Sequence, residues 1–377
     1  MKSIGIYIHI PFCIKKCNYC NFNSFKPSNL NQIKSYIQAL LKDVEISSSM
    51  QSKYTVNSIY IGGGTPSFIK AEYIKAIIER IRQDFKVGLN PEIAIEVNPN
   101  SVSCKKLQIY KKAGINRISM GVQSFNNKYL KILGRAHSSA QIKKALNLIK
   151  QQGFKNISID LIYGIPEQSL ADWRSELKSA IDLDITHISL YDLVIEKNTP
   201  FYAIRNKLKL ADNDQQTLMY KVAHDVLTDN KFKHYEVSSF AKNNMKSKHN
   251  LIYWSNLEYI GFGAGAYSYI NKERFSRIAD ISKYQQQAEQ AKFRHYHSET
   301  LSPVKLIEET LILRLRLLNG FNLIDIENSL IHKIPKRIIK VLNEFIDQGF
   351  IIFSNNRYKL SRKGLFQYDT IASEFLS

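Results

Sequence analysis

The stretch His9-Ile-Pro-Phe-Cys13-Ile-Lys-Lys-Cys17-Asn-Tyr-Cys20-Asn-Phe22 decides the fold, because it places three cysteines directly after a β-like run. The pattern is C-x3-C-x2-C. Three thiolates at this spacing can bind three irons of a [4Fe–4S] cube and leave the fourth iron without a protein ligand. An iron left open in this way can bind a small chelating ligand. The segment therefore predicts a metal cluster on Cys13, Cys17 and Cys20.

A zinc site is the alternative for these thiols. Zinc sites usually pair C-x2-C with a second cysteine pair or with histidines. The only other cysteine, Cys104, lies far along the chain, so the spacing favours the iron–sulfur cluster.

Outward from this stretch, β-branched runs alternate with helix-like stretches. The predicted strands are 4–10, 58–62, 93–97, 117–122, 157–162 and 187–191, and the predicted helices are 32–47, 71–84, 104–113, 140–151 and 169–182. Strands separated by helices of this length imply βαβ units and a parallel sheet. The fold class is therefore α/β, a partial (β/α)6 barrel of the TIM type with its chemistry at the C-terminal ends of the strands.

The rest of the chain predicts a different organisation. A helix is expected over 211–231, and a less regular part over 234–290. An amphipathic helix at 304–318, a helix pair at 322–330 and 336–348, and a hairpin (FIIF, SNNR, YKL) form a winged-helix pattern. We expect three parts: the core barrel at 1–210, a connecting region at 211–300, and a winged-helix-like α+β domain at 301–377.

The charge balance favours anionic partners. Of the 377 residues, 53 are Lys or Arg and 33 are Asp or Glu, which gives +20. Apolar runs fall far short of the roughly 20 residues of a membrane span, and no signal peptide is recognised, so we expect a cytoplasmic protein. Basic residues in the tail make DNA binding by a redox sensor one reading. Winged helices often serve only as packing modules, so we expect no nucleic-acid partner.

Two motifs carry a family resemblance. The segment Y-I-H-I-P-F-C at 7–13, with its cysteine spacing, and GGGTPS at 62–67 resemble the radical S-adenosylmethionine superfamily, and within it the coproporphyrinogen-dehydrogenase branch. The resemblance covers nearly the whole chain. It implies a [4Fe–4S] cluster and S-adenosylmethionine in a radical-SAM barrel, with a tail that covers the barrel mouth or contacts a partner.

The resemblance also implies site residues. Positions matching Tyr7, Gly63 and Glu96 contact a first cofactor molecule in the related dehydrogenases. Positions matching Tyr19, Gly64, Thr65, Gln123, Arg135 and Asp160 contact a second one. The residues themselves fit such roles, because consecutive glycines let the main chain approach a ligand closely. The sequence leaves open whether one or two cofactor molecules bind.

Two departures from the dehydrogenase pattern point to another branch. Phe22 stands where the dehydrogenases have a fourth cysteine, and 249–254 reads H-N-x-x-Y-W. Both features resemble the heme-chaperone branch, HemW. That resemblance implies heme binding, delivery of heme to respiratory-chain apo-cytochromes, and a cluster-dependent homodimer. Phe22 is accordingly placed among the cofactor-binding candidates.

His249 is the first candidate for the heme ligand, because a neutral imidazole nitrogen binds heme iron. Tyr253 and Trp254 would then pack on the macrocycle, and lysines 242, 246 and 248 would meet the propionates. The alternative is that His249 is a hydrogen-bonded packing residue. The chain has eight other histidines that compete for the role of ligand, notably His9, His137, His187, His295 and His297.

The alternative function is an enzyme, an oxygen-independent coproporphyrinogen III dehydrogenase that performs radical oxidative decarboxylation in porphyrin biosynthesis. Phe22 and the H-N-x-x-Y-W string argue against it, but the residues do not decide whether the chain is an enzyme. The positive surface is also suited to peripheral contact with anionic lipid.

Overall fold

The computed structural model describes residues 2–48 and 53–376. Within these residues twelve strands form one sheet, in the order β12-β11-β10-β9-β1-β2-β3-β4-β5-β6-β8-β7. The six central strands are β1 (Lys2–Ile10), β2 (Tyr54–Gly63), β3 (Val87–Val97), β4 (Arg117–Gln123), β5 (Asn156–Tyr163) and β6 (His187–Asp192). Each pairs in parallel with the next, which confirms the predicted α/β barrel core.

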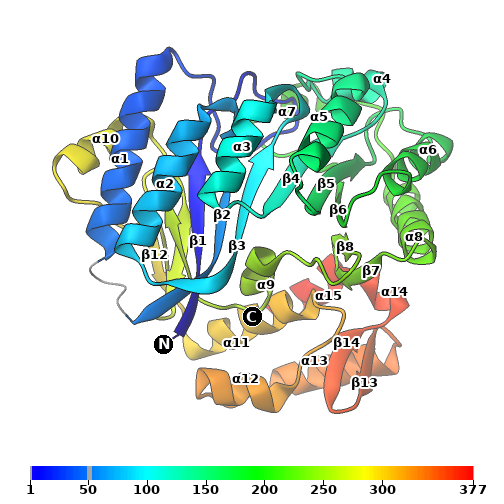
Figure 1. Cartoon of the computed structure of the whole chain (residues 1–377). Coiled ribbons are helices and arrows are strands. Elements are labelled where there is room, and N and C mark those ends of the chain that lie inside the picture. The colour runs from blue at the N-terminus through cyan, green and yellow to red at the C-terminus, as the bar shows by residue number, and fades with distance from the viewer. Residues whose placement is uncertain (1, 49–52, 377) are drawn as a thin grey trace.

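Helices cover the outer face of this sheet (Figure 1). They are α1 (Leu30–Ser48), α2 (Ala71–Asp84), α3 (Cys104–Ala113), α5 (Ser139–Gln151) and α6 (Leu170–Ile181), while α4 (Asn127–Ile132) lies at the top of the view, beyond the ends of the strands. In α2, Ile74, Ile77, Ile78 and Ile81 recur at helical spacing and are fully buried, so hydrophobic burial fixes the helix on the sheet. The short α4 was not predicted, because six residues carry too little periodicity.

The strand β1 shows how the sheet separates core from cavity. Ile4, Ile6, Ile8 and Ile10 are buried in the hydrophobic core. Because side chains alternate along a strand, Tyr7 and His9 point to the opposite, concave face. Polar and aromatic residues at such positions therefore line the interior of the barrel.

The segment predicted to be less regular instead extends the sheet on both sides. At one edge β9 (Tyr259–Phe262) pairs in parallel with β1, and β10 (Tyr267–Ile270), β11 (Glu273–Ser276) and β12 (Tyr296–Thr300) follow in antiparallel fashion. At the other edge lie β8 (Ser239–Ala241) and β7 (Lys233–Glu236). Strands of three to five residues are too short for a clear period-2 pattern, which is why the sequence does not reveal them.

The remaining helices and turns before the tail lie in several parts of the chain. They are α7 (Pro200–Ala203), α8 (Asn213–Asp229), α9 (Lys248–Trp254), α10 (Ile281–Glu289), and the 3-10 turns Pro66–Phe68, Pro99–Ser101 and Arg205–Lys207. The boundaries proposed at 210 and 300 stay predictions, and residues 1 and 377 lie outside the described ranges.

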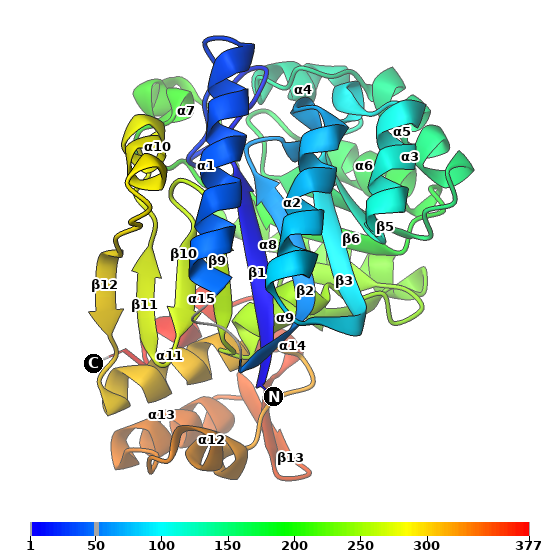
Figure 2. The ribbon, with the colours of Figure 1, turned by 60° about the vertical axis from the view of Figure 1, so that its left-hand side comes forward.

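The tail has the predicted order of helices and hairpin. It consists of α11 (Pro303–Leu315), α12 (Leu323–Leu330), α13 (Lys336–Asp347), β13 (Ile351–Ser354), β14 (Arg357–Leu360), α14 (Arg362–Leu365) and α15 (Tyr368–Ser373). It packs at the end of the barrel where β1 begins, as both views show (Figures 1 and 2). The tail therefore does not cover the mouth at the C-terminal ends of the strands, contrary to that expectation.

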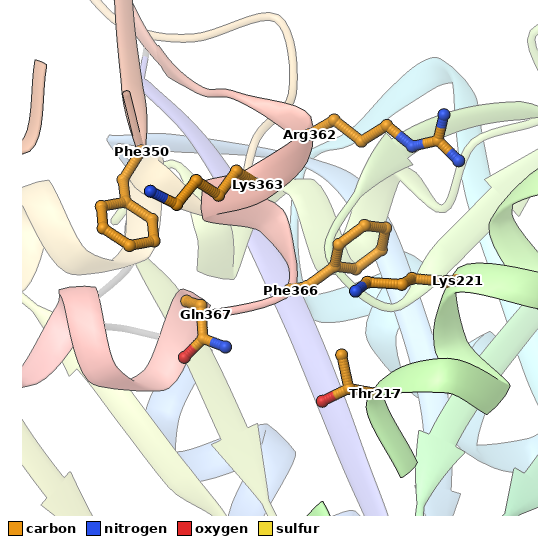
Figure 3. Close-up of a pocket in the computed structure, with 7 residues that line it drawn as sticks. All are labelled: Thr217, Lys221, Phe350, Arg362, Lys363, Phe366 and Gln367. Atoms are coloured by element: carbon orange, nitrogen blue, oxygen red, sulfur yellow. The ribbon is translucent and has the colours of Figure 1, made fainter. Parts of the chain in front are cut away.

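The junction between α8 and the tail is basic and aromatic (Figure 3). Arg362 pairs with Asp225 of α8. The Lys363 ammonium lies 4.1 Å from the centre of the Phe350 ring, and Lys221 of α8 lies 5.4 Å from that of Phe366. The contacts of Arg362 and Phe366 with α8 attach the tail to the barrel, whereas Lys363 and Phe350 both belong to the tail. No helix in the described part of the chain is long and apolar enough to cross a membrane.

Candidate functional site

The loop after β1 presents the three clustered cysteines to one cavity of about 580 Å³, here called the cysteine cavity. The Cys13 sulfur lies 3.4 Å from the Thr65 hydroxyl, and burial raises the pKa of its thiol. The Cys17 sulfur accepts a hydrogen bond from Arg135 Nη1 at 3.5 Å. The third cysteine, Cys20, lines the same cavity.

The three thiols share one cavity, Cys13 being buried and Cys17 and Cys20 partly exposed. A cubane places each thiolate on a different iron, so its ligands must surround a common space rather than one point. Three cysteine side chains that face one cavity meet that requirement.

A glycine edge after β2 lies against the cysteine loop. Gly63 has a φ of 114°, and a Cβ there would lie 2.7 Å from the His9 ring. A Cβ at Gly64 would lie 2.9 Å from the Cys13 sulfur and 3.0 Å from the Phe12 carbonyl oxygen. Only glycine fits this close approach. Gly63 and Gly64 pack the second strand closely against the cysteine loop, and both line the cysteine cavity.

Glu96 stands at the end of β3 within the same cavity. Its carboxylate accepts hydrogen bonds from the Tyr60 hydroxyl at 2.9 Å and from the Gly63 backbone N–H at 3.2 Å. Burial first, and then the nearby Asp160 carboxylate, raise the pKa of Glu96 to about 7. Burial likewise raises the pKa of Asp160 to about 6. The cavity thus holds two carboxyl groups that titrate near neutral pH.

The structure brings together nearly all of the predicted site residues. The cysteine cavity is lined by Cys13, Cys17, Cys20, Tyr19, Phe22, Gly63, Gly64, Thr65, Glu96, Gln123, Arg135 and Asp160. Asn98 was missed: its amide donates to Thr65 at 3.1 Å, and its carbonyl oxygen accepts from Arg135 at 2.6 Å. Its position directly after the third strand's Glu96 and Val97, at the active face, was the available signal.

Tyr7 lines a second cavity of about 750 Å³, here called the aromatic cavity. Its hydroxyl lies 3.0 Å from His9 Nδ1. Its ring stacks on that of Tyr60, with the centroids 6.4 Å apart. Since Tyr60 lines the cysteine cavity, this pair of rings stands between the two cavities.

His249 lines neither cavity. It is fully buried, with Nδ1 2.8 Å from the Ser58 hydroxyl and Nε2 2.8 Å from the Tyr253 hydroxyl. Its ring stacks on that of Tyr60, and burial lowers the pKa of His249 to about 3. Both ring nitrogens are engaged, so this conformation matches the packing alternative and presents no nitrogen to heme iron.

The other motif residues also serve packing. Tyr253 reaches the aromatic cavity, whereas the Trp254 ring lies under the Arg316 guanidinium, 4.2 Å from its centre. Lys242 and Lys246, which were expected to meet propionates, lie over the rings of Phe232 and Tyr235.

The packing role of His249 predicts a stability effect. His249→Ala should lower the free energy of unfolding by about 2–4 kcal/mol, because it removes two buried hydrogen bonds and leaves a cavity. Urea unfolding of the full chain measures this, with His332→Ala in the tail as the control, expected within about 0.5 kcal/mol of the parent. Equal unfolding free energies for the two variants would contradict the packing role.

Comparisons with known proteins agree with this geometry. The family model of the radical SAM superfamily matches residues 7–180, and that of the HemN C-terminal domain matches residues 301–366. The crystal structure of coproporphyrinogen III oxidase (HemN) from Escherichia coli superposes with a TM-score of 0.86 at 22% identity, covering 99% of this chain and 90% of that chain. At this identity the match shows the fold alone.

Curated relatives are more similar in sequence. Heme chaperone HemW from Lactococcus lactis is 33% identical over 377 residues, covering 100% of this chain and 98% of the relative. The protein of the same name from Bacillus subtilis is 33% identical, with 100% and 99% covered, and that from Escherichia coli 37% identical, with 71% and 70% covered. Radical SAM membership implies a [4Fe–4S] cluster and S-adenosylmethionine, which the cysteine cavity fits. The chain belongs to the HemW heme-chaperone family within the radical SAM superfamily.

Proposed function

We propose that the protein is a cytoplasmic heme chaperone, which binds heme and transfers it to respiratory-chain apo-cytochromes. The observation that carries this proposal is the similarity, over the whole chain, to relatives named heme chaperone HemW. The protein would carry a [4Fe–4S] cluster on Cys13, Cys17 and Cys20 and S-adenosylmethionine in the cysteine cavity.

The cavity lining supports this cofactor assignment. When bound, the cluster would be able to supply an electron for cleavage of the carbon–sulfur bond of S-adenosylmethionine. Carbonyl groups of Gly63 and Gly64 would accept from the ammonium of S-adenosylmethionine, and Glu96 would accept from its ribose hydroxyls. Four carboxylates (Glu96, Asp160, Asp192, Glu196) and four cations (Lys15, Lys16, Arg117, Arg135) line the cavity, which suits a ligand that carries both signs of charge.

The raised pKa of Glu96 predicts pH-dependent cofactor binding. Between pH 8 and pH 6 Glu96 gains a proton, since its pKa is about 7, and a neutral carboxyl accepts hydrogen bonds more weakly than a carboxylate. The affinity for S-adenosylmethionine should therefore fall as the pH falls. In Glu96→Gln it should be about tenfold weaker at pH 8, as expected for loss of a charge-assisted hydrogen bond.

Anaerobic equilibrium dialysis of the cluster-reconstituted protein measures this affinity. In Glu96→Gln the affinity for S-adenosylmethionine should also depend less on pH. The pH dependence that is left is expected from the titration of Asp160. An unchanged profile in Glu96→Gln, with cluster absorbance equal to that of the parent, would contradict the role of Glu96.

Phe22 supports the chaperone over the dehydrogenase. The residue is 68% exposed at the position of the dehydrogenases' fourth cysteine. The dehydrogenase remains the second candidate because the solved HemN structure shares the fold. Anaerobic incubation with coproporphyrinogen III separates the two, since only the enzyme forms protoporphyrinogen. Catalytic formation of protoporphyrinogen would overturn the chaperone proposal. Transfer of bound heme to an added apo-cytochrome would support it.

The exposed surface bears on partners. Ile14, Phe22 and Phe25 are exposed apolar side chains on or beside the cysteine loop, which supports a homodimer formed near the cluster.

Several basic side chains of the tail form ion pairs within the protein: Lys333 with Glu327, Arg337 with Glu308, Lys340 with Glu344 and Arg362 with Asp225. These pairs weaken the case for nucleic acid, and transient contact with anionic lipid stays part of the proposal.

A further inference from the structure

The aromatic cavity differs from the cysteine cavity in charge. No Asp or Glu side chain lines it among the described residues, whereas Lys16 and Arg277 do. Arg277 is already paired with the buried Asp43, with an N–O distance of 2.8 Å. The Lys16 ammonium donates to the Phe22 carbonyl oxygen at 3.4 Å, so Lys16 supplies the positive charge that no carboxylate of the cavity balances. A cavity with this lining favours an anionic ligand over a cationic one.

Its walls suit a large planar ligand. Six aromatic residues line it, namely Tyr7, Phe22, Tyr253, Tyr259, Tyr267 and Tyr296. Phe22 and Tyr267 are 68% and 47% exposed, so their rings are accessible at the cavity. The volume of about 750 Å³ lies within the usual range of about 300–1,000 Å³ for small-molecule sites. Exposed rings of this kind stack on flat apolar ligands.

The histidines of the chain can be sorted by their partners. Seven of them have a ring nitrogen within hydrogen-bond or ion-pair distance of another group: His9, His137, His187, His224, His234, His249 and His295. Within residues 2–48 and 53–376, the ring of His297 makes no hydrogen bond or ion pair, and His297 lines the aromatic cavity. The remaining histidine, His332, lies in the tail, away from the cavity.

We propose that heme binds in the aromatic cavity with His297 as its iron ligand. This inference rests on the proposed function, because it names the site for the heme that a chaperone must hold. Lys16 meets a propionate, and the rings of Phe22 and Tyr267 contact the macrocycle. His249 acts indirectly, by holding Tyr253 against the cavity through its hydrogen bond of 2.8 Å.

The proposed heme site and the cluster site share one loop. Lys16, Asn21 and Phe22 of the cysteine loop line both cavities. The loop that holds the cluster therefore also forms one wall of the heme site. Rearrangement of this loop on cluster or cofactor binding changes both sites together.

The test is an anaerobic heme titration of the reconstituted full chain, followed in the Soret band. His297→Ala should shift the Soret maximum and weaken binding about tenfold or more, as loss of an iron–imidazole bond requires. Added imidazole should restore the parent spectrum. The matched control is His295→Ala, two positions away on the same segment, where the ring stacks on Phe275 outside the cavity and heme binding should not change.

The outcomes separate the inference from the function on which it rests. Tight heme binding by the parent and an unchanged spectrum in His297→Ala would overturn His297 as ligand and leave the chaperone in place. Absence of specific binding by the parent would overturn the chaperone itself. A second variant, Phe22→Ser, should weaken binding without shifting the Soret maximum, and full affinity in that variant would place heme outside the aromatic cavity.

Discussion

Replacement of Cys13, Cys17 and Cys20 together by serine is expected to abolish the broad visible absorbance of the reconstituted protein. The serine hydroxyl stays protonated near neutral pH and is a poor ligand for iron, whereas each cysteine thiolate would bind one iron of the cluster. Iron and acid-labile sulfide should fall from about four of each per chain to background. S-adenosylmethionine binding should fall with them, since the cluster would hold part of the cofactor.

The matched control for this variant is Cys104→Ser. Cys104 is exposed at the start of α3 and lines neither the cysteine cavity nor the aromatic cavity. That variant should keep the full iron content and spectrum. A triple variant that kept the absorbance would show that the cluster is not on this loop.

Gly63→Ala should have the second large effect. The glycine has a φ of 114°, which side chains rarely adopt, and the added Cβ would meet the His9 ring at 2.7 Å. Strain and overpacking should together lower the free energy of unfolding by about 3 kcal/mol. The shift also displaces the backbone N–H that donates to Glu96, so affinity for S-adenosylmethionine should fall at least about tenfold.

Gly349→Ala is the control that measures the effect of backbone strain alone. Gly349 also has a positive φ, 74°, but nothing lies within 4 Å of an added Cβ. Only conformational strain remains, about 1 kcal/mol, and cofactor binding should equal that of the parent. Equal cofactor affinity in Gly63→Ala and Gly349→Ala would contradict the role of the glycine edge. Urea unfolding and equilibrium dialysis supply the two readouts.

The cysteine cavity could be predicted from sequence because its parts are local. The Cys13 loop follows β1, Gly63 ends β2 and Glu96 lies next to the last residue of β3. Parallel strands bring their C-terminal ends together. The residue spacing within each segment therefore predicted which groups could bind a ligand. The predicted α/β barrel was enough to bring these segments to one site.

The role of His249 could not be predicted from the residues next to it in the sequence. Its histidine type and aromatic neighbours suggested a ligand, but Ser58, a distant residue of β2, accounts for one of its ring nitrogens. Likewise the aromatic cavity draws on β1, β9, β10, β11 and β12 and on the cysteine loop. The parallel pairing of β9 with β1 is a long-range contact that the local sequence pattern does not reveal. The aromatic cavity therefore appeared only in the structure, and only the structure separates His297 from the other candidate histidines of the sequence.

The most direct test of the account is an anaerobic heme titration of the reconstituted parent protein, with and without S-adenosylmethionine and with albumin as competitor. The account predicts saturable, roughly stoichiometric binding that albumin does not reverse. Heme that leaves quantitatively for albumin in both conditions, together with conversion of coproporphyrinogen III to protoporphyrinogen, would contradict the chaperone and identify the enzyme.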